Sequence, residues 1–142
     1  MEKKMIYTGE ISLNTRGDGE ILDITARVQK QVTDSGITNG IATIFVTHST
    51  VGITTVEFEP GLVEDLGKLW ERIAPKNIPY AHDAHWGDGN GYAHVRASLL
   101  GASLTIPFTD KKLVLGTWQQ IIIVDFDNRP RSRTVIVQVM GE

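Results

Sequence analysis

The chain has 142 residues, of which 41% are hydrophobic and 22% charged, a composition typical of one soluble globular domain. Its formal net charge of -3 and its pI of about 5.8 exclude an overall positive field that would draw it to nucleic acid or anionic lipid. It has no cysteine, which excludes disulfides, thiolate metal ligands and a cysteine nucleophile and leaves His, Asp and Glu for such chemistry.

The N-terminal residues, MEKKMIYTGEISL, contain two lysines but no apolar run behind them, so we expect no signal peptide. No apolar run in the chain approaches the length of a membrane span. We therefore expect a cytoplasmic protein that binds neither membranes nor nucleic acid.

The first third of the chain predicts a strand, a turn and a helix. Residues 5–13 alternate enough for a half-buried strand, and residues 16–19 are typical of a turn. The spacing of apolar residues over 24–32 predicts a short amphipathic helix, with Asp23 as a candidate N-cap and Gly36 at its end.

The rest of the chain is rich in strands. Residues 41–47 and 53–58 predict two strands joined by a turn, and a helix is expected to begin at Pro60, where the missing amide hydrogen costs nothing. A short third helix is expected over 93–100. Later strands are expected at 103–108, 113–115, 118–126 and 134–140. Because strands often follow one another directly, the pattern favours a single α+β domain of residues 1–142, with a β-rich, mostly antiparallel core and about three helices.

The stretch 80–94, YAHDAHWGDGNGYAH, contains three of the four histidines together with two aspartates and a tryptophan. Its glycines fit neither a dinucleotide-binding fingerprint nor a calcium loop. We expect them to permit positive φ and to bring backbone amides close to a ligand. Loops of this kind present binding groups on a rigid scaffold, so we interpret this stretch as the site.

Three histidines, His48, His82 and His94, are the candidate metal ligands. Histidine is the commonest metal ligand, and three neutral imidazoles leave one position open on a tetrahedral zinc. No compact motif such as H-E-x-x-H places them, so the alternative that each is an ordinary polar or core residue stays open. His85 could replace one of the three.

Charged residues elsewhere are candidates for proton transfer and anion binding. Glu57, at a strand end, could act as a general base or orient a histidine, or it could be a solvated carboxylate. Arg96 lies near a helix N-terminus, which favours a phosphate. Arg129, Arg131 and Arg133 have the planar fork that suits phosphate, with protection of an edge strand as the alternative.

The segment Gly116-Thr117-Trp118-Gln119 is expected to turn one strand into the next. Trp118 either packs or forms an aromatic wall for a planar ring, and Gln119 could supply an orienting hydrogen bond.

Three ordered blocks resemble the YjbQ-like secondary thiamine-phosphate synthase family. They are THSTVGIT at 47–54, YAHDAHWGDGNGYAHVRASLLGASLTIP at 80–107 and LGTWQQIIIVDFDNRPRSR at 115–133. The resemblance implies an α+β fold, a homotrimer and a metal-capable histidine site near a subunit boundary. It matches His48, His82 and His94 to the family's histidines, Glu57 to its strand-end acid and residues 116–119 to its G-T-W-Q block.

The activity that the resemblance implies is that of a transferase, thiamine phosphate synthase. Such an enzyme joins a hydroxymethylpyrimidine diphosphate to a thiazole phosphate and releases pyrophosphate. A divalent metal, zinc in first place, is the expected cofactor. The alternatives are a non-catalytic trimeric protein that binds a metal or a small phosphorylated metabolite, and a metal-dependent phosphate-ester hydrolase. The expected catalytic residues are Glu57, Arg96, Trp118, Gln119 and Arg129.

Overall fold

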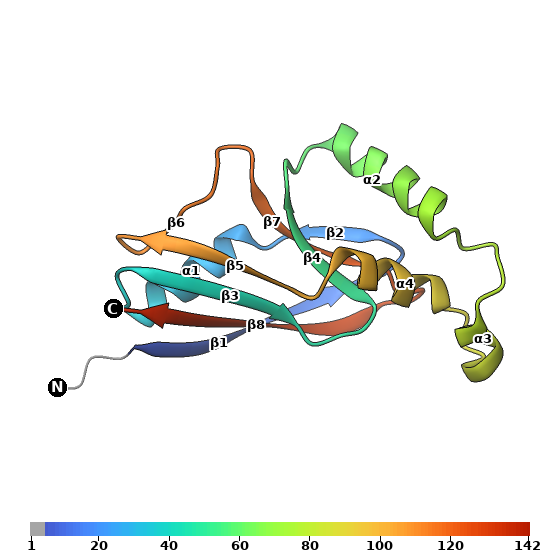
Figure 1. Cartoon of the computed structure of the whole chain (residues 1–142), viewed down its shortest axis with the longest axis horizontal. Helices are drawn as coiled ribbons and strands as arrows, with labels where there is room; N and C mark the ends of the chain where they lie inside the picture. Colours follow the sequence, from blue (N-terminus) through green and yellow to red (C-terminus); the bar gives the residue numbers. More distant parts are fainter. Residues whose placement is uncertain (1–4) are drawn as a thin grey trace.

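Two antiparallel sheets form the body of the protein. The computed structural model describes residues 5–142, and Lys3 and Lys4, on which part of the signal-peptide argument rests, lie outside that range. The five-stranded sheet has the order β1 (Ile6–Thr15), β8 (Arg131–Gly141), β3 (Gly40–Val46), β5 (Ser103–Thr109) and β6 (Lys112–Leu113) (Figure 1). The three-stranded sheet has the order β2 (Glu20–Asp23), β7 (Gln120–Asp125) and β4 (Val51–Val56).

Four helices accompany the sheets: α1 (Thr25–Ser35), α2 (Pro60–Ile73), α3 (Ala81–Trp86) and α4 (Gly91–Leu100). The expected α+β fold with a mostly antiparallel, β-rich core is confirmed. Helix α2 begins at the expected proline, and the Glu59 side chain caps it by accepting from two backbone N–H groups. Strand β2 and helix α3 were not expected, since each is too short to show a clear period.

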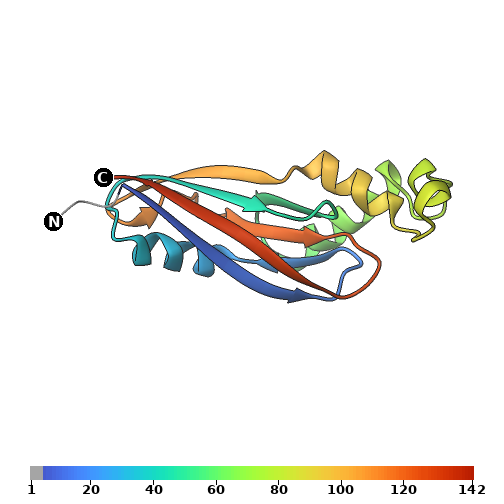
Figure 2. The same ribbon diagram turned by 90° about the horizontal axis from the view of Figure 1, so that it is seen from below.

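The hydrophobic core lies between the two sheets. The inner face of the five-stranded sheet packs against the three-stranded sheet and against α1, which lie end to end beneath it (Figure 2). Val28 and Val32, spaced by one helical turn, place the apolar stripe of α1 in this core. The opposite face of the three-stranded sheet packs against α2 and α4, where Trp70 meets Phe126 edge to face at 5.0 Å.

The outer face of the five-stranded sheet is uncharged along its central strands and mixes polar residues such as Thr43 and Gln138 with exposed apolar ones. Side chains alternate between the two faces of a strand, so Ile41 and Phe45 of β3 share the outer face with Met140 of β8. These three side chains are 41%, 46% and 45% exposed. Within residues 5–142, no helix is long and apolar enough to cross a membrane.

Candidate metal and anion site

The candidate site lies at the end of the molecule where α3 and α4 meet the β3–β4 turn (Figure 1). The stretch 80–94 forms α3, a glycine-rich turn and the first residues of α4. Gly87 and Gly89 have φ of 75° and 70°, which confirms that the glycines permit positive φ. Gly91 starts α4 so close to Tyr80 that an added Cβ would stand 2.7 Å from the tyrosine Cβ. The missing side chain therefore lets the two helices meet.

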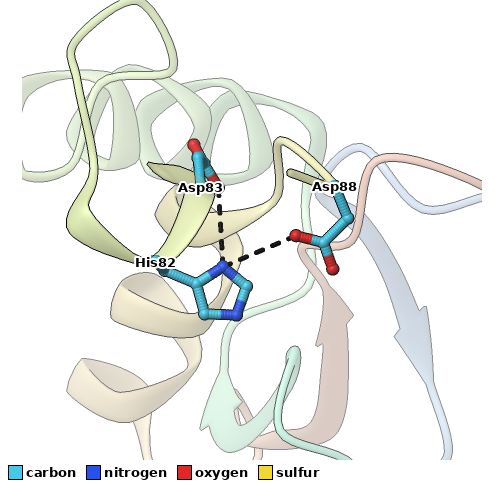
Figure 3. Close-up of side chains that lie close together, drawn as sticks. All are labelled: His82, Asp83 and Asp88. Carbon is cyan, nitrogen blue, oxygen red and sulfur yellow. Dashed lines mark hydrogen bonds and ion pairs between the residues drawn. The ribbon is translucent and has the colours of Figure 1, made fainter. Parts of the chain in front are cut away.

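His82, Asp83 and Asp88 form a compact cluster of possible metal ligands. Their nearest ligand atoms all lie within 4.8 Å of one another, and His82 Nδ1 lies 3.5 Å from Asp83 Oδ1 and 3.6 Å from Asp88 Oδ1 (Figure 3). Ligand atoms at about 2.1 Å from a tetrahedral zinc are roughly 3.4 Å apart, so these spacings are close to those that zinc requires. Imidazole and carboxylate donors also suit zinc and other divalent transition metals.

His94 lies directly beside this cluster. Its ring and that of His82 have centroids 4.4 Å apart and planes inclined by 36°. Burial, followed by the positive charge that His82 would carry, lowers the pKa of His94 below the ordinary value of 6.5. The neutral imidazole, which is the form that binds metals, is therefore favoured at neutral pH.

His48 comes from the β3–β4 turn and lines a polar cavity of about 340 Å³ together with Asp88 and His94. Its Nε2 accepts a hydrogen bond of 2.9 Å from the backbone N–H of Thr134. In a neutral ring this places the proton on Nδ1, which makes His48 a hydrogen-bond donor rather than a ready metal ligand. The structure brings all three predicted histidines to one site, and the ligand role of His48 stays a prediction.

Two arginines line the same cavity. Arg131, a third exposed, is paired with Asp127 at 3.2 Å. Arg133 is buried and binds Asp125 through two nitrogens, at 2.7 and 3.0 Å, which ties β8 of one sheet to β7 of the other. The cavity wall therefore combines fixed cations, carboxylates and imidazoles. A larger cavity of about 540 Å³, between residues 16–22 and Phe58, has no histidine in its wall.

Asp127 is a buried carboxylate behind this cavity. Its burial opposes ionisation, but hydrogen bonds from the Asn128 backbone N–H, Asn90 and Thr50, together with the charge of Arg131, outweigh it and lower the Asp127 pKa below 3.8. Asp127 is thus ionised at neutral pH, and its hydrogen bonds hold the cavity wall in place.

Three of the predicted catalytic residues lie far from the histidines. The register of β4 with β7 pairs Val51 with Asp125 at the histidine end and Val56 with Gln120 at the opposite end. Glu57, Trp118 and Gln119 follow or precede that opposite end, away from α3 (Figure 1). Trp118 is 71% exposed, and Gln119 Oε1 accepts from the backbone N–H of Gly116. Within one chain these residues do not meet the histidine cluster.

The other two predicted residues do not line the histidine cavity either. Arg96 is buried, where it donates to the carbonyl of Ala74 and pairs with Glu71 at 2.8 Å, so it fastens α4 to the end of α2. Arg129 lies exposed in the loop before β8. Their catalytic roles stay predictions, with a structural role now assigned to Arg96.

The sequence argument missed both carboxylates of the cluster and the buried aspartates. Asp83 and Asp88 stand one and six positions after His82, a spacing that fits no familiar metal motif. Asp125 and Asp127, two positions apart, are followed by two arginines that share the same spacing, Arg131 and Arg133. That repeated spacing of opposite charges was the signal available for the buried network.

Comparison with known proteins shows the family of the chain. Residues 9–142 match the family described as "UPF0047 protein YjbQ-like", and the chain belongs to that family. A UPF0047 protein of Methanothermobacter thermautotrophicus is 39% identical over 96% of this chain and 94% of its own. The UPF0047 protein YugU of Bacillus subtilis is 35% identical over 92% of this chain and 97% of its own.

Solved structures share the fold over nearly the whole chain. The crystal structure of a YbjQ-like protein of unknown function from Sulfolobus solfataricus P2 has a TM-score of 0.90 and 38% identity, covering 96% of this chain and 98% of that one. A hypothetical protein from Aeropyrum pernix K1 has a TM-score of 0.88 and 32% identity over 96% and 99% of the two chains.

The expected thiamine phosphate synthase activity is wrong as a conclusion from this family. The relatives are described as UPF0047 proteins, and the Sulfolobus structure as one of unknown function, so membership of the family implies neither a transferase nor thiamine biosynthesis.

Proposed function

We propose that this protein binds a divalent metal, zinc in first place, and uses it to hydrolyse a phosphate ester of a small metabolite. The observation that carries the proposal is the cluster of His82, Asp83 and Asp88, whose atoms have spacings suited to a metal. Two of its neighbours in space, His94 and His48, line the adjoining cavity, which Asp88 also lines. These three side chains would supply three ligands and leave the fourth position of a tetrahedral zinc open for water or a phosphoryl oxygen, beside the ring of His94.

The charge of the cavity supports an anionic ligand once a metal is present. Asp88 and Asp127 balance Arg131 and Arg133 in its wall, so the protein groups alone provide no net positive charge. A divalent cation bound by the cluster would add positive charge to the cavity and so favour the binding of an anion. Its chemistry there is Lewis-acid polarisation of a phosphoryl oxygen and activation of water.

The residues of the chain have separate tasks in this proposal. Arg131 is the more exposed of the two cavity arginines, and its fork suits the oxygens of a phosphoryl group. The His48 Nδ1 proton provides a further donor to the developing negative charge. Arg133, which is committed to Asp125, holds the cavity wall.

The decisive test compares three proteins purified without added metal: the wild type, His82→Ala and His85→Ala. His85 stands on the same helix and is exposed, so it controls for changes to α3 itself. We expect near-stoichiometric zinc in the wild type and in His85→Ala, and its loss in His82→Ala. We then expect zinc-dependent release of phosphate from p-nitrophenyl phosphate.

Two outcomes would contradict the proposal in different ways. A wild type that is empty and takes up no zinc would exclude the metal site. Zinc binding without phosphate release from any phosphomonoester tested would exclude the hydrolase and leave a binding site only.

The homotrimer and the cytoplasmic location are also proposals. The trimer is supported by the outer face of the central strands β3 and β8, which is uncharged and exposes Ile41, Phe45 and Met140. Large apolar side chains that are exposed on one uncharged face are a feature of many protein interfaces. The location rests on the composition of the chain alone.

A further inference from the structure

Helix α3 lacks the apolar anchor that usually holds a short helix to a protein. It has six residues, none of them buried, and Trp86 at its end is 71% exposed. Residues 84–89 are all exposed. Isolated helices of this length are unstable in water, and most helices in proteins owe their stability to the packing of an apolar face.

The chain is fixed firmly on both sides of this segment. Tyr80 packs against the core beside α2 and α4, and its hydroxyl donates to the carbonyl of Pro75 at 2.7 Å. Asn90 is 4% exposed and donates to Asp127. The segment 81–89 is therefore a loop between two fixed points, with Gly87 and Gly89 inside it in the left-handed region.

A ring contact and two hydrogen bonds link the segment to the body. The His82 ring lies against that of His94, Asp83 Oδ1 accepts from the Gly91 N–H at 2.8 Å, and the Asp88 carbonyl accepts from Asn128 at 3.0 Å. Each of the first two involves a residue of the proposed metal site. The same side chains thus bind the metal and position the helix.

The charges of the cluster make this arrangement sensitive to a cation. Asp83 and Asp88 place two carboxylates within 4.8 Å of each other, both facing His82 Nδ1, and a divalent cation would offset their repulsion more strongly than a neutral imidazole does. A divalent cation converts the repulsion into coordination and links both ends of the segment to His82. Where a site forms only with its metal, the free energy of metal binding becomes free energy of folding.

We infer that segment 81–89 is a metal-closed flap: the metal fixes α3 against His94 and places Asp88 in the cavity wall, and metal loss releases the segment. The inference rests on the proposed metal site and describes its regulation. The cavity is then complete only in the metal-bound protein, because Asp88 forms part of its wall.

The test is amide hydrogen exchange of the full chain, measured with zinc and after removal of metal by a chelator. We expect zinc to slow exchange in residues 81–89 at least tenfold, with no change in α2, which serves as the internal control. His85→Ala should behave as the wild type does, and His82→Ala should show no effect of zinc.

Zinc binding is measured separately by calorimetry, so the two proposals can fail independently. If the wild type does not bind zinc, the proposed metal site fails and the flap fails with it. If zinc binds but exchange in 81–89 is unchanged, the flap alone is overturned. If zinc still protects His82→Ala, His82 is not a ligand, and both the proposed site and the flap built on it are overturned.

Discussion

The rings of His82 and His94 stand 4.4 Å apart although they come from different helices, α3 and α4. Two imidazolium rings at this distance would repel each other, so the pair favours at least one neutral ring. Burial makes the larger contribution to the lowered pKa of His94, and repulsion from the charge of His82 makes the next one. This contact is what brings the proposed metal cluster to the edge of the cavity.

The pH dependence of stability should reveal the neutral histidines, and His48 provides the cleanest case. Burial, and then the charge of Arg133, lower its pKa below the ordinary value of 6.5 in the folded protein. The unfolded chain therefore takes up a proton at higher pH than the folded one. Stability should fall as the pH is lowered through about 6.5 and stop falling, for this group, below the folded-state pKa.

The measurement is the midpoint of thermal unfolding between pH 8 and pH 5 in metal-free buffer. His48→Gln, whose side-chain oxygen can still accept from the Thr134 N–H, should show a shallower fall than the wild type. His85→Gln changes an exposed histidine and serves as the control. If the unfolding midpoint of His48→Gln falls as steeply with pH as that of the wild type, His48 is not the cause of the fall.

Much of the fold could be predicted because its elements have clear periods. The spacing of Val28 and Val32 predicts α1, and Pro60 marks the first residue of α2. The start of β4 is different: it begins at Val51, inside the expected turn, because Val51 pairs with Asp125 of a strand far along the chain. Pairing between distant strands leaves no signal in the local sequence.

Only part of the site could be predicted, because a local pattern is visible in the sequence and a contact between distant segments is not. The concentration of histidines in 80–94 is local, so His82 and His94 could be identified from the sequence. The pairing of Arg133 with Asp125 depends on how two sheets pack, and the separation of Trp118 from the histidines depends on strand register. Neither is visible before the chain is folded.

Removing Arg133 should destabilise the protein strongly. Its side chain is 7% exposed and is paired with Asp125, whose side chain is 1% exposed. Replacement by methionine keeps the volume but leaves Asp125 buried without its cation, which costs about 3–5 kcal/mol of unfolding free energy. Chemical denaturation measures the change.

Lys68→Ala is the control for Arg133→Met. Lys68 pairs with Glu64 on the surface of α2, where both side chains are about 70% exposed. Such a pair contributes less than about 1 kcal/mol. A loss for Arg133→Met as small as that of Lys68→Ala would show that the network contributes little to stability.

Phosphate binding should depend on zinc and on Arg131. Because the protein charges in the cavity wall balance, calorimetry should show inorganic phosphate binding at least tenfold more weakly after zinc is removed. Arg131→Gln should weaken phosphate binding by a similar factor, about 1.4 kcal/mol, while zinc affinity stays unchanged. Arg129→Gln, in the exposed loop, is the matched control. An equal loss in both variants would point to a general charge effect instead of a specific contact.

The proposed trimer can be tested by light scattering after size-exclusion chromatography. Phe45 lies on the uncharged outer face of the central strands near the end of β3, next to Ile136 of β8 and Ser103 of β5. Phe45→Lys places a charge where a partner would bury it, so we expect a monomer for this variant and a trimer for the wild type. Trp118→Lys changes an exposed side chain elsewhere and should leave the trimer intact. A trimer that survives Phe45→Lys but dissociates in Trp118→Lys would place the interface at the 116–119 turn, and a monomeric wild type would exclude the trimer altogether.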